Sequence, residues 1–507
     1  MSSIAKLLEQ FLAHPFKNLA AIITAAVTSF FVVRAIYRVT FHPLVRFPGP
    51  KLRAISHLPH AFSGERGRQP YDVRELHKKY GPVVRICPNQ LSFITPGSWE
   101  DIHGHAATKK LLKYGYFKVR PDAQPMLTTS GEEHSRQRSA FAHGFSQRAI
   151  SEQSPTLTAH VDNLIAMLEQ KVKQESVFDV GEWMRFLAFD IIGDFTLNTQ
   201  FECVKNQRYH PWVALLMKWF RAVSFVTNAN AFGQLAPFIM LFAPVEHLKG
   251  VKDHLDMSAQ KVRERLAIGD DPTRNDLWTY LLRNKGDKAL SLGEMEVNAA
   301  LFIIAATEPL SDVLCGTLYF LALYPEVREK LRAELESCMG SDDALTMANT
   351  ARSPYLHAVI NESMRMYPPI PGGMRRKTPP QGHTISGIEI PPDTVVAVYQ
   401  LAAFTLPNNF ARTDQFIPER WLPADHPERP KDTLGDHQDV FQPFSVGPKN
   451  CIGKGLAYAE MKLIIARFAC AFDCKVVDDG FAIDKQTAYL FRDRPPLKLE
   501  VKMRKVS

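Results

Sequence analysis

Apolar and polar positions along the chain follow mainly the period of an α-helix. The longest apolar run, from Leu292 to Leu323, predicts one helix that crosses the whole body, and apolar residues at helical spacing between Ala457 and Phe468 predict another. From Tyr80 to Ile94, two short runs rich in β-branched residues flank a Pro-Asn-Gln turn and predict paired strands. The tail from Tyr489 to Val501 alternates and predicts closing strands. The fold class is therefore mainly α with small β-sheets.

Residues 19–37 form an apolar stretch long enough to cross a bilayer. Leu19 to Val33 is uncharged, and the span reaches Tyr37 if the Arg34 side chain bends back to the interface. Positive charges gather after the span, which predicts a lumenal segment 1–18 and a cytosolic body. A signal peptide is the alternative, but no clear small-residue cleavage site follows the span. A basic, Pro-rich hinge over 38–53 then leads to a single domain over 54–507.

The composition supports one globular body, because 45% of the 507 residues are hydrophobic and 22% are charged, without a linker-like or repetitive segment. The seven cysteines are scattered and odd in number, which indicates a reducing compartment. The net charge of +8 suits an anionic surface or an acidic protein partner. No basic patch with interleaved aromatic residues is present, which argues against nucleic acid as a partner.

The segment from Tyr209 to Leu248 is unusually dense in Trp, Phe, Met and Leu. It is more apolar than a solvent-facing connector should be. Two interpretations stay open: a roof over an apolar ligand pocket that also contacts the membrane, or ordinary core helices.

Candidate chemistry centres on Cys451, which a Gly/Pro-rich turn delivers to the start of the helix predicted downstream. Free N–H groups and the dipole at a helix N-terminus favour a thiolate, the form that binds metals. Gly447 would permit a turn closed to other residues, and Gly453 would leave room for a flat macrocycle. The alternative is a buried structural cysteine.

This loop resembles the cysteine-ligand loop of the cytochrome P450 superfamily, Phe-x-x-Gly-x-Arg-x-Cys-x-Gly. Phe444, Gly447, Cys451 and Gly453 match the pattern, whereas Lys449 takes the arginine position. Lysine keeps a positive charge for a haem propionate but lacks the planar two-pronged donor of arginine. The resemblance thus implies the cytochrome P450 fold and a haem whose iron is bound by the Cys451 thiolate.

Other segments continue the resemblance. Glu362 and Arg365 stand three residues apart on one predicted helix, and Arg420 follows in a Pro-Glu-Arg-Trp segment, as in the family's internal salt-bridge network. The resemblance gives these three a folding role. It makes Arg138 and Arg376 haem-propionate ligands.

The long helix resembles the family helix that lies over the haem, with one informative departure. The acid of its motif survives as Glu308, but Pro309 replaces the oxygen-activating threonine. Proline frees the carbonyl of Ala305 and predicts a kink, so the groove persists without the hydroxyl. Three groups could replace the missing hydroxyl: a water held by Glu308 or by the Ala305 carbonyl, the Ser311 side chain, or a hydroxyl on the substrate. Thr307 should point away.

The resemblance, closest to microsomal members from filamentous fungi, implies a monooxygenase of the endoplasmic reticulum membrane that oxidises an apolar small molecule in secondary metabolism. Glu308 and Pro309 are the candidate catalytic positions. Electrons would come from NADPH through a separate cytochrome P450 reductase, because the chain lacks a Gly-rich dinucleotide fingerprint followed by the expected acid. The alternatives are an isomerase, desaturase or ring-coupling enzyme without the threonine relay, and a catalytically silent haem-binding protein.

Overall fold

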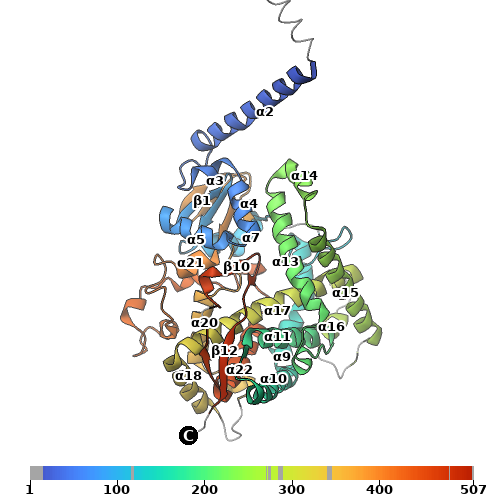
Figure 1. The fold of residues 1–507 in the computed structure, drawn as a ribbon, viewed down its shortest axis with the longest axis vertical. Coiled ribbons are helices and arrows are strands. Elements are labelled where there is room, and N and C mark those ends of the chain that lie inside the picture. Colours follow the sequence, from blue (N-terminus) through green and yellow to red (C-terminus); the bar gives the residue numbers. More distant parts are fainter. Residues whose placement is uncertain are drawn as a thin grey trace, which may run out of the picture.

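The computed structural model describes residues 15–115, 119–269, 271, 276–283, 289–339, 345–478 and 480–504. Its centre is α17 (Leu292–Leu323), which crosses the body as one helix (Figure 1). The helix begins where it was predicted, because Ser291 and Glu294 form a reciprocal capping box. The strongly apolar interior of α17 is buried by the helices that pack on it: α11 (Val180–Leu197), α15 (Val245–Ile268), α20 (Pro354–Met366) and α22 (Lys454–Ala471).

The remaining helices form the periphery. The α-helices are α3 (Lys51–Ile55), α4 (Leu58–Glu65), α5 (Gln69–Tyr80), α6 (Ser98–His103), α7 (His105–Lys110), α8 (Gly131–Ala142), α9 (Gln147–Glu152), α10 (Ser154–Gln174), α12 (Cys203–Asn206), α13 (Pro211–Asn230), α14 (Ala236–Met240), α16 (Leu277–Leu282), α18 (Pro325–Cys338), α19 (Met347–Thr350) and α21 (Gln400–Thr405). Short 3₁₀ turns include η4 (Pro418–Trp421) and η7 (Gly447–Lys449).

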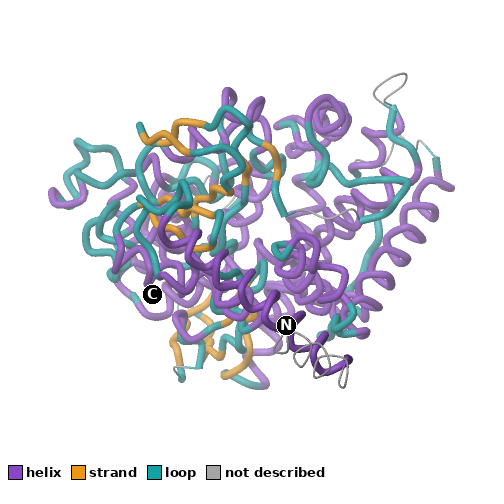
Figure 2. The backbone as a smooth tube through the Cα atoms, turned by 90° about the horizontal axis from the view of Figure 1, so that it is seen from above, coloured by secondary structure: helices purple, strands orange, loops and turns teal. Residues whose placement is uncertain are grey.

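The strands build small sheets that lie mostly in the left half of Figure 2. The largest has the order β1-β2-β8-β5-β3, from β1 (Val83–Cys87), β2 (Gln90–Phe93), β8 (Val395–Val398), β5 (Arg376–Lys377) and β3 (Leu112–Lys113). A three-stranded sheet joins β4 (Val177–Asp179), β12 (Lys498–Met503) and β9 (Phe472–Val476). Two hairpins pair β6 (His383–Ile385) with β7 (Ile388–Ile390) and β10 (Thr487–Ala488) with β11 (Arg492–Asp493). The predicted β1–β2 pair and the closing strands are confirmed.

The N-terminal apolar stretch forms α2 (Pro15–Thr40), which projects away from the body (Figure 1). Its span Phe16–Thr40 is long and apolar enough to cross a membrane, and none of its most apolar window is buried. The core helix α17 passes the same test, but 78% of its window is buried inside the protein. An N-terminal membrane anchor therefore fits α2. Of the predicted lumenal segment 1–18, residues 1–14 lie outside the described part of the chain.

The predicted hinge is helical at both ends, since α2 continues to Thr40 and α3 begins at Lys51. Between them, the chain is tied to the first strand: the Arg85 amide donates to the Pro48 carbonyl at 2.8 Å, and the Arg85 guanidinium donates to the Arg38 carbonyl at 2.9 Å. The Arg38 guanidinium donates in turn to the Ile55 carbonyl. Hydrogen bonds thus fix the end of α2 to the body.

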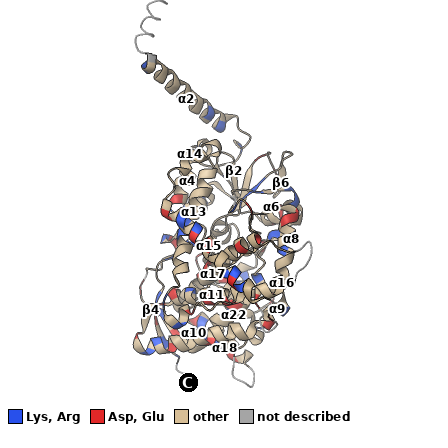
Figure 3. Ribbon diagram, turned by 90° about the vertical axis from the view of Figure 1, so that its right-hand side faces the viewer, with Lys and Arg blue, Asp and Glu red and all other residues tan. Residues whose placement is uncertain are grey.

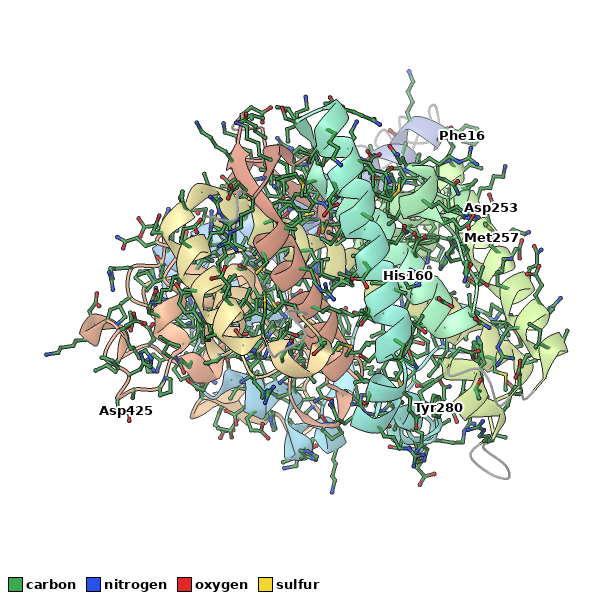
Figure 4. All side chains as sticks on the ribbon, turned by 90° about the horizontal axis from the view of Figure 1, so that it is seen from below. Phe16, His160, Asp253, Met257, Tyr280 and Asp425 are labelled. Carbon is green, nitrogen blue, oxygen red and sulfur yellow. The ribbon has the colours of Figure 1, made fainter. Side chains whose placement is uncertain are left out.

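The aromatic-rich segment 209–248 contains both buried core residues and an exposed apolar part, so each of the two interpretations of its composition fits a different part of it. Trp212 and Phe220 of α13 are buried core residues, whereas Phe238, Leu241 and Phe242 in and after α14 are exposed, Phe242 by 81%. α14 lies at the end of the body nearest α2 and carries no charged side chain (Figures 1 and 3). The opposite end is built by α10, α11 and α18; there His160 of α10 contacts Asp194 of α11 at 3.0 Å, whereas Phe16 of α2 lies on the far side (Figure 4).

Candidate functional site

The cysteine loop has the shape that the sequence predicted. The Cys451 amide donates to the Phe444 carbonyl at 3.0 Å, and Cys451 stands three residues before α22 begins. Gly447 has φ +72°, and a Cβ there would lie 2.3 Å from the His103 carbonyl oxygen, so only glycine fits. At Gly453 the nearest protein atom to such a Cβ is 3.7 Å away, which leaves space beside the sulfur.

Cys451 is exposed, although the surrounding body is dense enough that burial raises the pKa of its thiol. The Gly453 backbone N–H and the charges of Arg138 and Lys454 act in the opposite direction and favour the thiolate. The Phe444 ring of the same loop packs on Tyr458 of α22, with ring centroids 5.1 Å apart. The loop is thus anchored to α22 and presents one exposed sulfur atom.

Positive charge collects beside this sulfur. Arg138 donates to the carbonyl oxygen and to the side-chain oxygen of Asn450, both at 2.7 Å. Arg376 is buried and its Nε has no partner. Among the described residues, no carboxylate pairs with either arginine or with Lys449, whose pKa is lowered by burial and by Arg376. The structure thus gathers all three predicted propionate ligands and leaves their charge uncompensated.

Further basic residues join this group, and the sequence analysis did not assign them a role. Lys113 of β3 donates to the carbonyl oxygens of Leu127 and Thr129 at 2.6 and 2.7 Å. Burial, followed by the charges of Lys449 and Arg376, lowers the pKa of Lys113 to about 7. No motif marks this lysine, because its position depends on β3 pairing with β5.

Two buried histidines lie in the same region. Burial, and then the charges of Lys113 and other basic residues, lowers the pKa of His134 to about 4. His103 is also buried, and its pKa lies well below the usual range for the same kind of reason. The surroundings of both rings therefore favour the neutral form.

The middle of α17 has one open face. Ala305 is exposed and Ala306 and Pro309 are half-buried, whereas Thr307 and Glu308 are completely buried. The helix runs without a break through Pro309, which cannot donate to the Ala305 carbonyl. Thr307 points away as predicted, because its hydroxyl donates back to the Ile303 carbonyl at 2.7 Å.

Glu308 faces α11 rather than the open face. Its Oε2 accepts a hydrogen bond from Arg185 at 3.2 Å, and its Oε1 has no partner among the described residues. The Ser311 hydroxyl donates to the Glu308 carbonyl at 3.1 Å and accepts from Arg494 at 3.2 Å. Ser311 is thus already engaged, and Glu308 keeps one oxygen free for another group.

The predicted Glu362 network is present and completely buried. Arg365 donates to both carboxylate oxygens at 2.9 and 2.8 Å, and Arg420 donates to Oε1 at 3.1 Å. Trp421 Nε1 donates at 2.9 Å, and the opposite side of Arg420 pairs with Asp436. Burial alone would raise the pKa of Glu362, but the two arginines lower it below its usual value. Sequence reasoning missed Asp436, which no local spacing connects to the network.

The family model for cytochrome P450 matches residues 48–501. The chain belongs to the cytochrome P450 family. It is 33% identical over 478 residues to the cytochrome P450 monooxygenase aclL of Aspergillus oryzae, covering 93% of this chain and 96% of the relative. It is 34% identical over 477 residues to the trichothecene C-15 hydroxylase of Fusarium sporotrichioides, covering 93% and 95%. It is 35% identical over 476 residues to the cytochrome P450 monooxygenase rdc4 of Metacordyceps chlamydosporia, covering 92% and 96%.

This cytochrome P450 is accordingly a monooxygenase, and the family implies a haem with a cysteine thiolate ligand. The residues present fit such a group. An exposed sulfur stands near the half-buried Arg138 and Lys449 and the buried Arg376, and none of the three cations pairs with a carboxylate among the described residues. A planar macrocycle with two carboxylates would supply the missing charge.

Proposed function

We propose that Cys451 is the axial haem ligand and that Arg138, Arg376 and Lys449 bind the haem propionates. The uncompensated positive charge beside the exposed sulfur supports this assignment more than any other observation. Phe444, Gly447 and Gly453 would shape the loop around the macrocycle. The group would supply dioxygen activation, and the thiolate ligand favours cleavage of the O–O bond.

In this proposal the chain excludes water and manages protons around the reacting centre. Ala305, Ala306 and Pro309 give α17 an apolar open face, which would lie against the substrate. Glu308 would hold a proton at Oε1, the oxygen without a partner, while Arg185 orients the carboxylate through Oε2. A water or a substrate hydroxyl would then replace the threonine hydroxyl that Pro309 removes.

We infer an apolar small-molecule substrate in fungal secondary metabolism. The exposed apolar residues after α13 lie at the same end of the body as α2, so both would contact lipid there (Figure 1). The proposal places the anchor in the endoplasmic reticulum membrane as a single pass, with residues 54–507 as one cytosolic catalytic domain. Electrons would come from NADPH–cytochrome P450 reductase.

Pro309 favours a second candidate, because the chain lacks the hydroxyl of the usual proton relay. In that case the enzyme would isomerise, desaturate or couple rings instead of inserting oxygen. Whether product formation requires dioxygen and reductase would separate an isomerase from the other reactions. A third candidate, a catalytically silent haem-binding protein, has the least support, because relatives that match over almost the whole chain are named as monooxygenases or hydroxylases.

The first experiment compares masses. The compound that accumulates when the gene is removed is supplied to microsomes that contain the full-length enzyme and its reductase. A gain of one oxygen supports the monooxygenase; equal mass or loss of two hydrogens supports the second candidate. Cys451→Ser should abolish the absorption spectrum that a thiolate gives to reduced, carbon monoxide-bound haem. An unchanged spectrum would contradict Cys451 as the ligand.

A further inference from the structure

Tyr458 of α22 connects the cysteine loop to α20. Its ring packs on Phe444 of the loop, with ring centroids 5.1 Å apart, and on His357 of α20, with centroids 4.9 Å apart. Its hydroxyl donates to Asn361 Oδ1, also on α20, at 2.8 Å. Burial raises the pKa of Tyr458, so the hydroxyl keeps its proton and remains a donor. Two ring contacts and one hydrogen bond therefore fix the position of this tyrosine.

Phe444 links Tyr458 to the residue that carries the sulfur. The Phe444 carbonyl accepts a hydrogen bond from the Cys451 amide at 3.0 Å. The same phenylalanine thus contacts Tyr458 through its ring and Cys451 through its backbone. A displacement of Phe444 would therefore change the position of Cys451.

The backbone of the loop needs support from outside at this point. Ser445, directly after Phe444, has φ +60°, in the left-handed region that a residue with a Cβ rarely adopts. Such a conformation persists only where the surrounding structure imposes it. The packing of Phe444 on Tyr458 is a contact of this kind.

The start of the same loop has a second support on α20. Phe441 packs on Trp421, with ring centroids 4.5 Å apart, and Trp421 donates to Glu362 at 2.9 Å. Glu362 follows Asn361 in the sequence, so two neighbouring residues of one helix support the loop at two points. The Glu362 support belongs to the buried salt-bridge network, whereas the Asn361 support acts through the neutral hydrogen bond of Tyr458.

We propose that Tyr458 is a positioning residue for the haem ligand. By packing on Phe444 and bonding to Asn361, it holds the Cys451 sulfur where it can bind the iron. This inference rests on the proposed haem site. Phe444 is part of the cysteine-loop pattern, whereas Tyr458 and Asn361 lie outside it, so the proposal extends the ligand site to a second helix.

The experiment uses the full-length protein in detergent, with its haem reduced and bound to carbon monoxide. It follows the loss of the thiolate absorption band at a guanidinium concentration below the unfolding transition. Tyr458→Phe keeps the ring but removes the hydrogen bond, and the band should disappear about threefold to tenfold faster than in the wild type. Asn361→Leu should have a similar effect. The double variant should lose the band no faster than the single variants, because both changes remove the same bond.

Tyr355→Phe is the matched control. Tyr355 also lies on α20 and donates a hydrogen bond of 2.8 Å, but to Glu419, which still pairs with Lys330 in the variant. This variant should lose the thiolate band at the wild-type rate, even where circular dichroism shows that its unfolding midpoint is lower. A residue that only stabilises the fold would instead change the band and the midpoint together.

Three results would overturn the inference: a wild-type rate in Tyr458→Phe, an equal acceleration in Tyr355→Phe, or a double variant whose acceleration is the product of the two single effects. The last would show that Tyr458 and Asn361 act independently of their hydrogen bond. Failure of the haem proposal itself would appear differently, as a wild-type protein without the thiolate spectrum.

Discussion

Glu308 and Glu362 are both completely buried carboxylates that pair with arginine, yet their surroundings differ. Both oxygens of Glu362 accept hydrogen bonds, from two arginines, one tryptophan and the Ile417 amide. Glu308 uses one oxygen for Arg185 and leaves the other without a partner. The oxygens of Glu362 are thus occupied by fixed donors, whereas one oxygen of Glu308 can still accept a hydrogen bond from another group.

Under the proposed function, this difference separates a structural role from a chemical one. A carboxylate whose acceptor sites are filled by fixed donors is held ionised and immobile. The buried Glu308 oxygen that has no partner among the described residues is the one that would take and release a proton. Burial, charge and pairing with arginine do not distinguish the two residues.

The largest effect is expected at Glu362. Glu362→Ala leaves Arg365 and Arg420 buried with uncompensated charge, and the free energy of unfolding should fall by about 3–5 kcal/mol. Denaturant titration of the full-length protein in detergent measures this loss. Glu75→Ala is the control, because Glu75 is exposed and its 2.8 Å pair with Lys78 should contribute no more than ~1 kcal/mol. Equal losses in the two variants would contradict the structural assignment.

A third buried acid, Glu460 of α22, extends the comparison because its side chain has no partner among the described residues. Burial raises the pKa of Glu460 to about 8. The native state therefore keeps a proton that the unfolded state releases near pH ~4.5, so stability falls as the pH rises from there to about 8.

Glu460→Gln removes this ionisation. Its stability relative to the wild type should be nearly unchanged at pH ~4.5 and greater by about 2–4 kcal/mol at pH ~9. Paired denaturant titrations across this range provide the measurement. A difference that does not vary with pH would show that Glu460 ionises normally in the folded protein.

The expected effect at Glu308 is on turnover. Glu308→Gln keeps the shape but removes the titratable oxygen, so product formed per NADPH should fall by about tenfold or more. Asp312→Asn is the matched control, since Asp312 lies one turn later on α17 and pairs with Arg494. Both variants leave an arginine opposite an amide, so a similar loss of product in both would point to damaged packing rather than to proton transfer.

The smallest change is expected from Pro309→Thr, which places a hydroxyl on the open face of α17. Product formed per NADPH should change by about threefold, well below the effect of removing an essential acid. Thr307→Val is the control, because the Thr307 hydroxyl bonds back to Ile303. If peroxide release and product yield both stay at wild-type values, Pro309 is merely structural.

The sequence was most informative where chemistry depends on local spacing. Cys451 with its two glycines, and Glu362 with Arg365, each occupy one short segment, so their arrangement follows from a single loop or helix. The long helix over 292–323 was also predictable, because one apolar run covers it, and Ser291 with Glu294 caps its first turn. From Pro309 the sequence predicted a groove at this point of the helix, and the structure has its open face there.

Contacts between distant segments were not predictable in the same way. Arg185 reaches Glu308 only because α11 packs along α17, and its one sequence signal is a lone arginine inside an apolar helix. Asp436 and Asn450 meet arginines from other elements through their loops.

The bonds at the end of α2 also determine where the protein can be cut. The membrane span ends in sequence before the body begins, but Arg38 and Pro48 both accept hydrogen bonds from Arg85 of β1. A fragment that starts after Thr40 would leave a guanidinium donor of Arg85 without its acceptor and disturb the first sheet. Truncated forms should therefore retain Arg38.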